Sequence, residues 1–189
     1  MGCQTSGLLE RDYDFATEKF RLIRKALRTG DLQGILAMLK SLFAAIPYHL
    51  HIEAEAYYHS IFFTVMTTLG FDIDAEVPTS RGRIDAVLEL EDRVYVFEFK
   101  YVACPPEASE LFATRKADAS NQPHLSLRFT NESEKRKLAD KALKNGMKQI
   151  ADKGYADKYL GSGKTIYLVA FAFLGRDNVE MESRIIGQA

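Results

Sequence analysis

The chain has 189 residues, of which 47% are hydrophobic, and a formal net charge of −1. This length is enough for one globular domain with a substantial core and leaves no room for a second large one. The small net charge excludes a general attraction to nucleic acid, so such binding would depend on a local basic patch. No apolar run approaches the roughly 20 residues of a membrane helix. Cys3 and Cys104 lack the spacing of a disulfide framework or a zinc site, which predicts a cytoplasmic protein.

Two helices are predicted near the N-terminus, over residues 13–29 and 32–45. Gly30 provides the end of the first helix, and Asp31 provides the cap of the second. We expect this pair to belong to a helical extension over residues 1–45 and to lead into the core rather than form it. The apolar stripe of the second helix consists of Ile35, Met38, Leu39 and Leu42.

A third helix, predicted over residues 52–69, is apolar nearly all round and is expected to pack against a sheet. Glu55 and His59 lie on one side of it by their i, i+4 spacing. An acid near a helix start stabilises the helix by itself, and a histidine beside tyrosines is more often a hydrogen-bonded core residue than a catalytic base. The first strand is predicted over residues 71–77, where Glu76 either joins an acidic cluster or faces solvent.

Two further strands are predicted over residues 83–90 and 93–101, which are rich in β-branched and aromatic residues. With a tight turn centred on residues 91 and 92, residues whose numbers sum to 183 face each other. Asp85 then lies opposite Glu98, with Cβ atoms about 5 Å apart, and Lys100 shares the face of Glu98. We expect that face to carry Val87, Val94 and Val96 as well, and the opposite face to carry Ile84, Ala86, Leu88, Phe97 and Phe99.

The proximity of Asp85 and Glu98 requires compensation. Two ionised carboxylates at that separation repel by roughly 3 kcal/mol at an effective dielectric of 20, and charged residues inside a sheet with two apolar faces are rarely left unpaired. A divalent cation would compensate, and Mg²⁺ or Mn²⁺ fits because these ions prefer oxygen ligands. The alternative is a solvated glutamate and lysine on a surface hairpin.

The C-terminal part begins with a polar segment over residues 102–134, for which we expect a long loop with at most a short helix. A helix is predicted over residues 135–153, and strands are predicted over 165–174 and 179–186. One side of the helix carries the apolar stripe Ala139, Leu143, Met147 and Ile150. The other side carries a basic ridge, Lys137, Lys141, Lys144 and Lys148, which is either a solvated face or a phosphate contact without base reading.

Residues 160–165 are similar to a phosphate-binding loop, but the pattern requires glycine at the position of Lys158 and a helix after the loop. The segment that begins at Thr165 has the pattern of a strand instead. We therefore expect a turn here and no nucleotide hydrolysis.

The order of Asp85 and then Glu98-x-Lys100 across a hairpin resembles the catalytic core of the PD-(D/E)XK nuclease superfamily. More specifically, the chain resembles the bacterial domain found behind AAA-ATPase-like domains. The proline that gives the motif its name is absent. The segments that carry the resemblance are Glu55-Ala56-Tyr57-Tyr58-His59-Ser60, Gly82-Arg83-Ile84-Asp85, Glu98-Phe99-Lys100, and Gln149-Ile150 with Gly154-Tyr155.

The resemblance implies an α/β fold with a restriction-endonuclease-like core, a mixed central sheet flanked by helices, over residues 46–189. It implies metal-dependent hydrolysis of phosphodiester bonds in DNA or RNA. Asp85, Glu98 and the backbone carbonyl of Phe99 would hold Mg²⁺ or Mn²⁺. Lys100 would orient the attacking water or stabilise developing negative charge.

The resemblance also implies roles outside the hairpin. Glu55 would assist metal or water binding, and Gln149 with Tyr155 would orient a water or a phosphate oxygen. Lys148 and Arg83 are further candidates for substrate binding. The expected partners are nucleic acid and an AAA-ATPase-like domain or protein. The alternatives are a catalytically inactive nuclease-fold module that binds nucleic acid or a protein, and a structural interaction domain.

Overall fold

The structure is a computed structural model that describes residues 6–103, 109–113, 125–129, 132–175 and 178–187. For residues 6–16, residue 48 and the described residues between 104 and 131, it describes the backbone and not the side chains. Its helices are α1 (Ser6–Thr29), α2 (Leu32–Ala44), α3 (Glu55–Thr68) and α4 (Glu132–Asp152), with single 3₁₀ turns at Tyr48–Leu50 and Asp157–Tyr159. Its strands are β1 (Ile73–Thr79), β2 (Gly82–Glu89), β3 (Arg93–Val102), β4 (Ser109–Ala113), β5 (Leu125–Phe129), β6 (Thr165–Leu174) and β7 (Asn178–Ile186).

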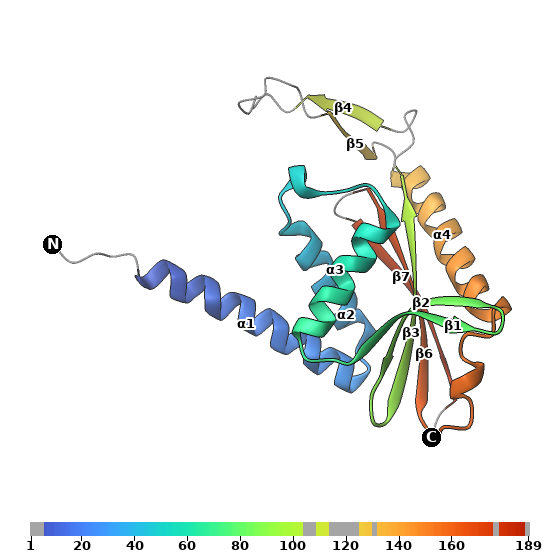
Figure 1. The fold of residues 1–189 in the computed structure, drawn as a ribbon. Helices are drawn as coiled ribbons and strands as arrows, with labels where there is room; N and C mark the ends of the chain where they lie inside the picture. The colour runs from blue at the N-terminus through green and yellow to red at the C-terminus, as the bar shows by residue number, and fades with distance from the viewer. Residues whose placement is uncertain (1–5, 104–108, 114–124, 130–131, 176–177, 188–189) are drawn as a thin grey trace.

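The centre of the fold is a five-stranded mixed sheet with strand order β1-β2-β3-β6-β7. Strands β3 and β6 are parallel, and the other neighbours are antiparallel. Helices α1, α2 and α3 lie on one side of the sheet and α4 lies on the other (Figure 1). The predicted α/β architecture, with a meander of three strands and a further strand joining the sheet, is confirmed.

The register of the β2–β3 hairpin is the predicted one. The paired residues run from Ala86 with Phe97 to Glu89 with Val94, and Leu90 N–H donates to the Arg93 carbonyl at 2.8 Å to close the turn. The observed pairing ends at Ala86 with Phe97, one position before Asp85 and Glu98.

The two faces of the hairpin also follow the expected alternation, with one exception. Val87, Val94 and Val96 pack together on one face, as expected. Ile84, which was expected on the opposite face, packs with these valines instead. The alternation breaks where β1 contains Glu76 at a φ of +53°, a value that distorts the β1–β2 ladder next to Asp85. The prediction for Ile84 was wrong because it assumed a regular alternation, which this break in the β1–β2 ladder interrupts.

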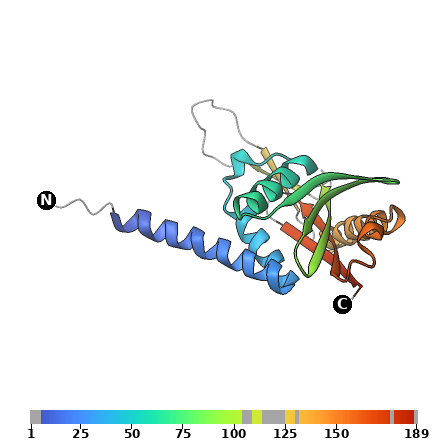
Figure 2. The same cartoon turned by 60° about the horizontal axis from the view of Figure 1, so that its bottom comes forward.

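The N-terminal helices also depart from expectation, because they form part of the core. Gly30 (φ +74°) and the Asp31 cap, whose Oδ1 accepts from Gly34 N–H at 2.8 Å, separate them as predicted. Leu27 of α1 and Phe43 of α2 are fully buried in the same cluster as Phe97. The first half of α1 stands away from this body (Figure 2). The domain boundary between residues 45 and 46 stays a prediction.

Three segments differ in detail from the sequence-based predictions. Helix α3 begins at Glu55, and its Ala56, Ser60 and Thr64 are exposed, so it is buried on one side rather than all round. The segment expected to hold at most a short helix contains the antiparallel pair β4–β5. Residues 104–108, 114–124 and 130–131 of that segment lie outside the described residues.

The turn before β6 is not a phosphate-binding loop, because a strand follows it. Lys164 Nζ donates to Glu89 Oε1 at 2.7 Å and to the Leu90 carbonyl at 2.8 Å, which ties this turn to the β2–β3 turn. Among the described residues, no helix is both long and apolar enough to cross a membrane.

Candidate active site

The candidate site forms where β2 stops pairing with β3 and leaves the edge of β3 uncovered. Two carboxylates take the place of the missing strand. Phe99 N–H donates to Asp85 Oδ2 at 2.8 Å, and Tyr101 N–H donates to Glu55 Oε2 at 3.1 Å. Because the N–H and C=O of a strand residue point toward the same neighbour, the Phe99 carbonyl lies on this edge too.

Glu98 is the central residue of the site. Its side chain is 0% exposed, and its Oε1 accepts a hydrogen bond from Lys100 Nζ at 2.6 Å. Its other oxygen, Oε2, is buried and has no hydrogen-bond partner among the described residues. Burial raises the pKa of Glu98 to about 7; the charge of Asp85 adds to this increase, and Lys100 opposes it.

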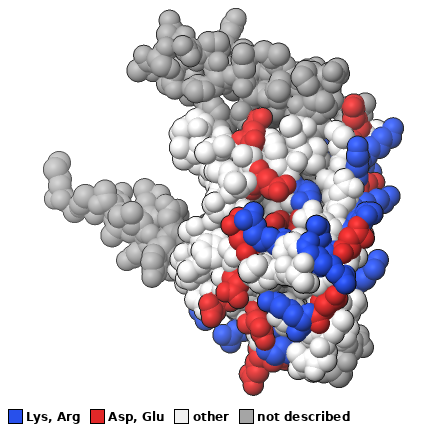
Figure 3. Space-filling view, turned by 45° about the vertical axis from the view of Figure 1, so that its right-hand side comes forward, with Lys and Arg blue, Asp and Glu red and all other residues white. Residues whose placement is uncertain are grey.

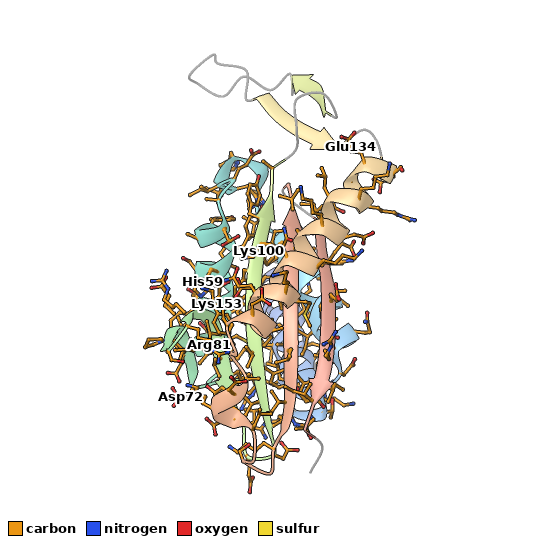
Figure 4. All side chains as sticks on the ribbon, turned by 90° about the vertical axis from the view of Figure 1, so that its right-hand side faces the viewer. His59, Asp72, Arg81, Lys100, Glu134 and Lys153 are labelled. Atoms are coloured by element: carbon orange, nitrogen blue, oxygen red, sulfur yellow. The ribbon has the colours of Figure 1, made fainter. Side chains whose placement is uncertain are left out.

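Lys100 is half-buried beside Glu98, and 23% of its side chain is exposed. Burial lowers the pKa of Lys100, but the hydrogen bond to Glu98 and the negative charges of the site outweigh burial, so the net pKa is raised. Lys100 is therefore a protonated amine between α3 and α4 (Figure 4). It is placed to interact with negative charge that enters from the solvent side.

Helix α4 packs closely over Glu98 and Lys100 at Gly146, a residue that the sequence analysis did not single out. A Cβ at Gly146 would lie 3.0 Å from Ala170 Cβ, 3.6 Å from Glu98 Cγ and 3.7 Å from Lys100 Cγ. A glycine inside a helix costs about 1 kcal/mol of stability relative to alanine. A glycine within the predicted helix was therefore the feature of the sequence that could have indicated a close contact here.

His59 lies one turn of α3 beyond Glu55, and its ring stacks on Phe99 with a centroid distance of 5.2 Å. Its Nε2 is buried without a partner among the described residues. With Glu76 it lines a hollow of about 410 Å³ between α3 and β1. Glu76 is exposed and pairs with Arg83 at 3.2 Å, so it faces solvent rather than the carboxylates.

The downstream candidates form a separate group next to β2. Gln149 Nε2 donates to the Tyr155 hydroxyl at 3.4 Å, and this hydroxyl donates to the Arg83 carbonyl. Tyr155 is 1% exposed, so these contacts connect α4 to the strand that carries Asp85. The basic ridge of α4 is exposed, and Lys148 forms an ion pair with Asp152. Figure 3 shows Lys and Arg side chains gathered on this side of the molecule, with acidic side chains among them.

The chemistry of these groups fits a hard divalent cation. Asp85, Glu98 and the Phe99 carbonyl supply oxygen ligands, and the buried Glu98 Oε2 has no competing donor in the described part of the chain. No group of three or more His, Cys, Asp or Glu side chains arranged for a metal occurs among the described residues. Two carboxylates with a carbonyl and waters are a usual set for Mg²⁺.

Comparisons with known proteins identify a family for most of the chain. Residues 53–183 match the sequence profile of the PD-(D/E)XK nuclease superfamily. A relative from Azotobacter chroococcum mcd 1, described as an uncharacterized protein in the vnfD 5' region, is 29% identical over 152 residues, which cover 78% of this chain and 22% of the relative. The chain thus spans about a fifth of the length of that relative. No solved structure matches significantly.

Proposed function

Because the chain belongs to the PD-(D/E)XK nuclease superfamily, we propose that it is a metal-dependent nuclease that hydrolyses phosphodiester bonds in DNA or RNA. The observation that carries this proposal is the environment of Glu98. A fully buried carboxylate with one unpartnered oxygen lies beside a second carboxylate and a protonated lysine. Such an arrangement is costly unless a cation or substrate completes it.

Asp85, Glu98 and the carbonyl of Phe99 would hold Mg²⁺ or Mn²⁺. When bound, such an ion polarises a phosphate oxygen and lowers the pKa of a water molecule. Glu55 shares the uncovered edge of β3 with Asp85. It is therefore placed to hydrogen-bond a water molecule on that edge.

The proposed role of Lys100 is to stabilise the negative charge that develops on the phosphate or to orient the attacking water. Its Nζ is held by Glu98 Oε1, and this contact fixes the position of the positive charge before substrate binds. A preorganised charge of this kind needs no rearrangement during the reaction. Gln149 and Tyr155 would position the substrate next to β2, and the exposed Arg83 and Lys148 would contact its phosphates.

An AAA-ATPase-like domain or partner is part of the proposal. The relative in Azotobacter is more than four times as long as the segment that matches this chain. Such a length leaves room for further domains beside a nuclease domain.

A catalytically inactive module that binds nucleic acid is the second candidate. It is favoured by the absence of a group of three metal-ligating side chains among the described residues and by the contact of Asp85 with Phe99 N–H. This candidate predicts salt-sensitive binding of nucleic acid without turnover.

The test is cleavage of duplex DNA, single-stranded DNA and RNA in Mg²⁺, in Mn²⁺ and in EDTA. Asp85→Asn keeps an acceptor for Phe99 N–H but removes the charge, and Lys100→Met removes the amine. We expect both variants to cleave about 10²- to 10³-fold more slowly, whereas Lys158→Met, on an exposed residue, should retain activity. Equal cleavage by all four proteins, or binding without any cleavage, would overturn the proposal.

A further inference from the structure

A second basic feature has all its cationic residues outside the segment that matches the nuclease profile. It is a groove of about 540 Å³ between the C-terminal half of α1 and the end of α3, two segments that lie side by side in Figure 1. We call it the α1 groove. Its lining includes four cationic side chains and an aromatic ring, all from α1: Arg21, Arg24, Lys25, Arg28 and Phe20.

Most of this positive charge has no acidic partner. Glu18 neutralises Arg21, with N–O distances of 2.7 and 2.6 Å. Arg24 and Lys25 are exposed and form no ion pair within the described part of the chain, and the same holds for Arg28.

The arrangement opposes helix stability. Arg24 and Arg28 lie four positions apart on the helix, and like charges at this spacing destabilise a helix by about 0.2–0.5 kcal/mol per pair. A bound polyanion would remove this repulsion.

We propose that the α1 groove binds the sugar–phosphate backbone of nucleic acid, as a contact separate from the candidate active site. This inference rests on the proposed nuclease function, which supplies a polyanionic substrate. The cationic side chains recur on successive turns of α1, about 5.4 Å apart, so they can reach successive phosphates of one strand. Guanidinium groups bind phosphate through paired hydrogen bonds.

The distance to the active site sets a minimum substrate length. Glu55 and Thr68, which borders the groove, are at opposite ends of α3, about 20 Å apart along the helix axis. At 3.4 Å per phosphate of a duplex strand, this distance corresponds to about six base pairs. A shorter substrate reaches the carboxylates without reaching the groove.

The direct test is the salt dependence of binding, measured by fluorescence anisotropy with a long duplex between 50 and 200 mM KCl. Asp85→Asn is present in every protein to prevent cleavage. Arg24→Ala with Lys25→Ala removes two phosphate contacts, which should reduce the slope of log K against log salt by about 1.8. Between 50 and 200 mM KCl, the affinity of the protein with an unaltered groove should fall by about 12-fold more than the affinity of the double variant.

Lys158→Ala with Arg184→Ala makes the same change in net charge on exposed residues outside the groove, and its slope should match that of the unaltered groove. Equal slopes for both double variants would overturn the inference. Poly-glutamate serves as a second probe, a model of an acidic protein segment. If the α1 double variant lost poly-glutamate binding but bound DNA unchanged, the inference would be overturned and the groove would be assigned to an acidic protein segment. Thermal unfolding by circular dichroism establishes that both variants are folded.

A second measurement separates this inference from the proposed function. Hydrolysis of a small phosphodiester, bis(p-nitrophenyl) phosphate, should be equal with and without the α1 substitutions, whereas the KM for a long duplex should rise. No hydrolysis of either substrate would refute the nuclease proposal, and the anisotropy experiment would still decide on the groove. An unchanged KM for the long duplex would count against the groove.

Discussion

The two faces of β3 are equally inaccessible to solvent, but their energetics are opposite. On one face, Phe97 and Phe99 each stack on Phe171 with centroid distances of 6.0 Å, and all three rings are 0% exposed. On the other face, Val96 is followed by Glu98, which is also 0% exposed. Burial of aromatic surface stabilises the fold, whereas burial of Glu98 opposes its ionisation. Substitutions on the two faces should therefore change stability with opposite signs.

The largest effect is expected on the aromatic face. Phe97→Ala should lower the free energy of unfolding by about 3–5 kcal/mol, because it removes buried ring surface and leaves a cavity. Urea unfolding measures the change. Leu160→Ala removes an apolar side chain that is 56% exposed and should change stability by less than about 0.5 kcal/mol. A loss below about 1 kcal/mol for Phe97→Ala would show that the ring contacts contribute little.

On the opposite face, Glu98→Gln should change the pH dependence of stability. The carboxyl group has a pKa of about 7 in the folded state against an ordinary value of 4.5 for glutamate, so between these values the folded state binds more protons than the unfolded state. Stability from this group is therefore present below pH 4.5 and is lost as the pH rises through 7. The loss is about 3 kcal/mol, and Glu98→Gln should not show it.

Chemical denaturation of both proteins from pH 4.5 to pH 8 measures this difference. We expect the glutamine variant to become progressively more stable relative to the wild type across the range. Mn²⁺ should raise the melting temperature of the wild type at pH 8 and have little effect on the variant. Parallel pH profiles for the two proteins would contradict the environment assigned to Glu98.

Local sequence patterns were sufficient to predict the register of the hairpin that carries Asp85 and Glu98. A two-residue turn at residues 91 and 92 and the two-residue repeat of a strand place Asp85 opposite Glu98 and put Lys100 on the same face. The structure has the predicted register from Ala86 with Phe97 to Glu89 with Val94, and the position of Asp85 opposite Glu98 stays a prediction. The same local signals located Gly30 and Asp31 between the first two helices.

Other features depend on contacts between distant segments, so the sequence pattern did not reveal them. The face of Ile84 changes at the break in the β1–β2 ladder, where Glu76 on the other strand has a positive φ. The burial of Leu27 and Phe43 against the sheet depends on where α1 and α2 pack, which their own apolar stripes do not specify. The closeness of Gly146 to Glu98 likewise depends on how α4 crosses the sheet.

Gly146→Ala should have the smallest effect on stability of these substitutions. It changes the packing over the face of β3 that carries Glu98 and leaves the aromatic face unchanged. Alanine favours the helix by about 1 kcal/mol, but its Cβ would lie 3.0 Å from Ala170 Cβ and 3.6 Å from Glu98 Cγ. These opposing effects should leave the free energy of unfolding within about 1 kcal/mol of the wild type. The close contact with Ala170 must be relieved by a shift of α4, the helix that also contacts Glu98 and Lys100, and this shift should slow cleavage by about tenfold.

Asn145→Ala is the matched control, because Asn145 is the exposed neighbour of Gly146 on α4. It should gain helix stability without any change in cleavage. If Gly146→Ala were instead as active as the wild type and more stable by the full helix preference, α4 would tolerate the methyl group without disturbing Glu98. In that case the glycine would have no role in positioning the carboxylate, and only the strands would determine the geometry of the site.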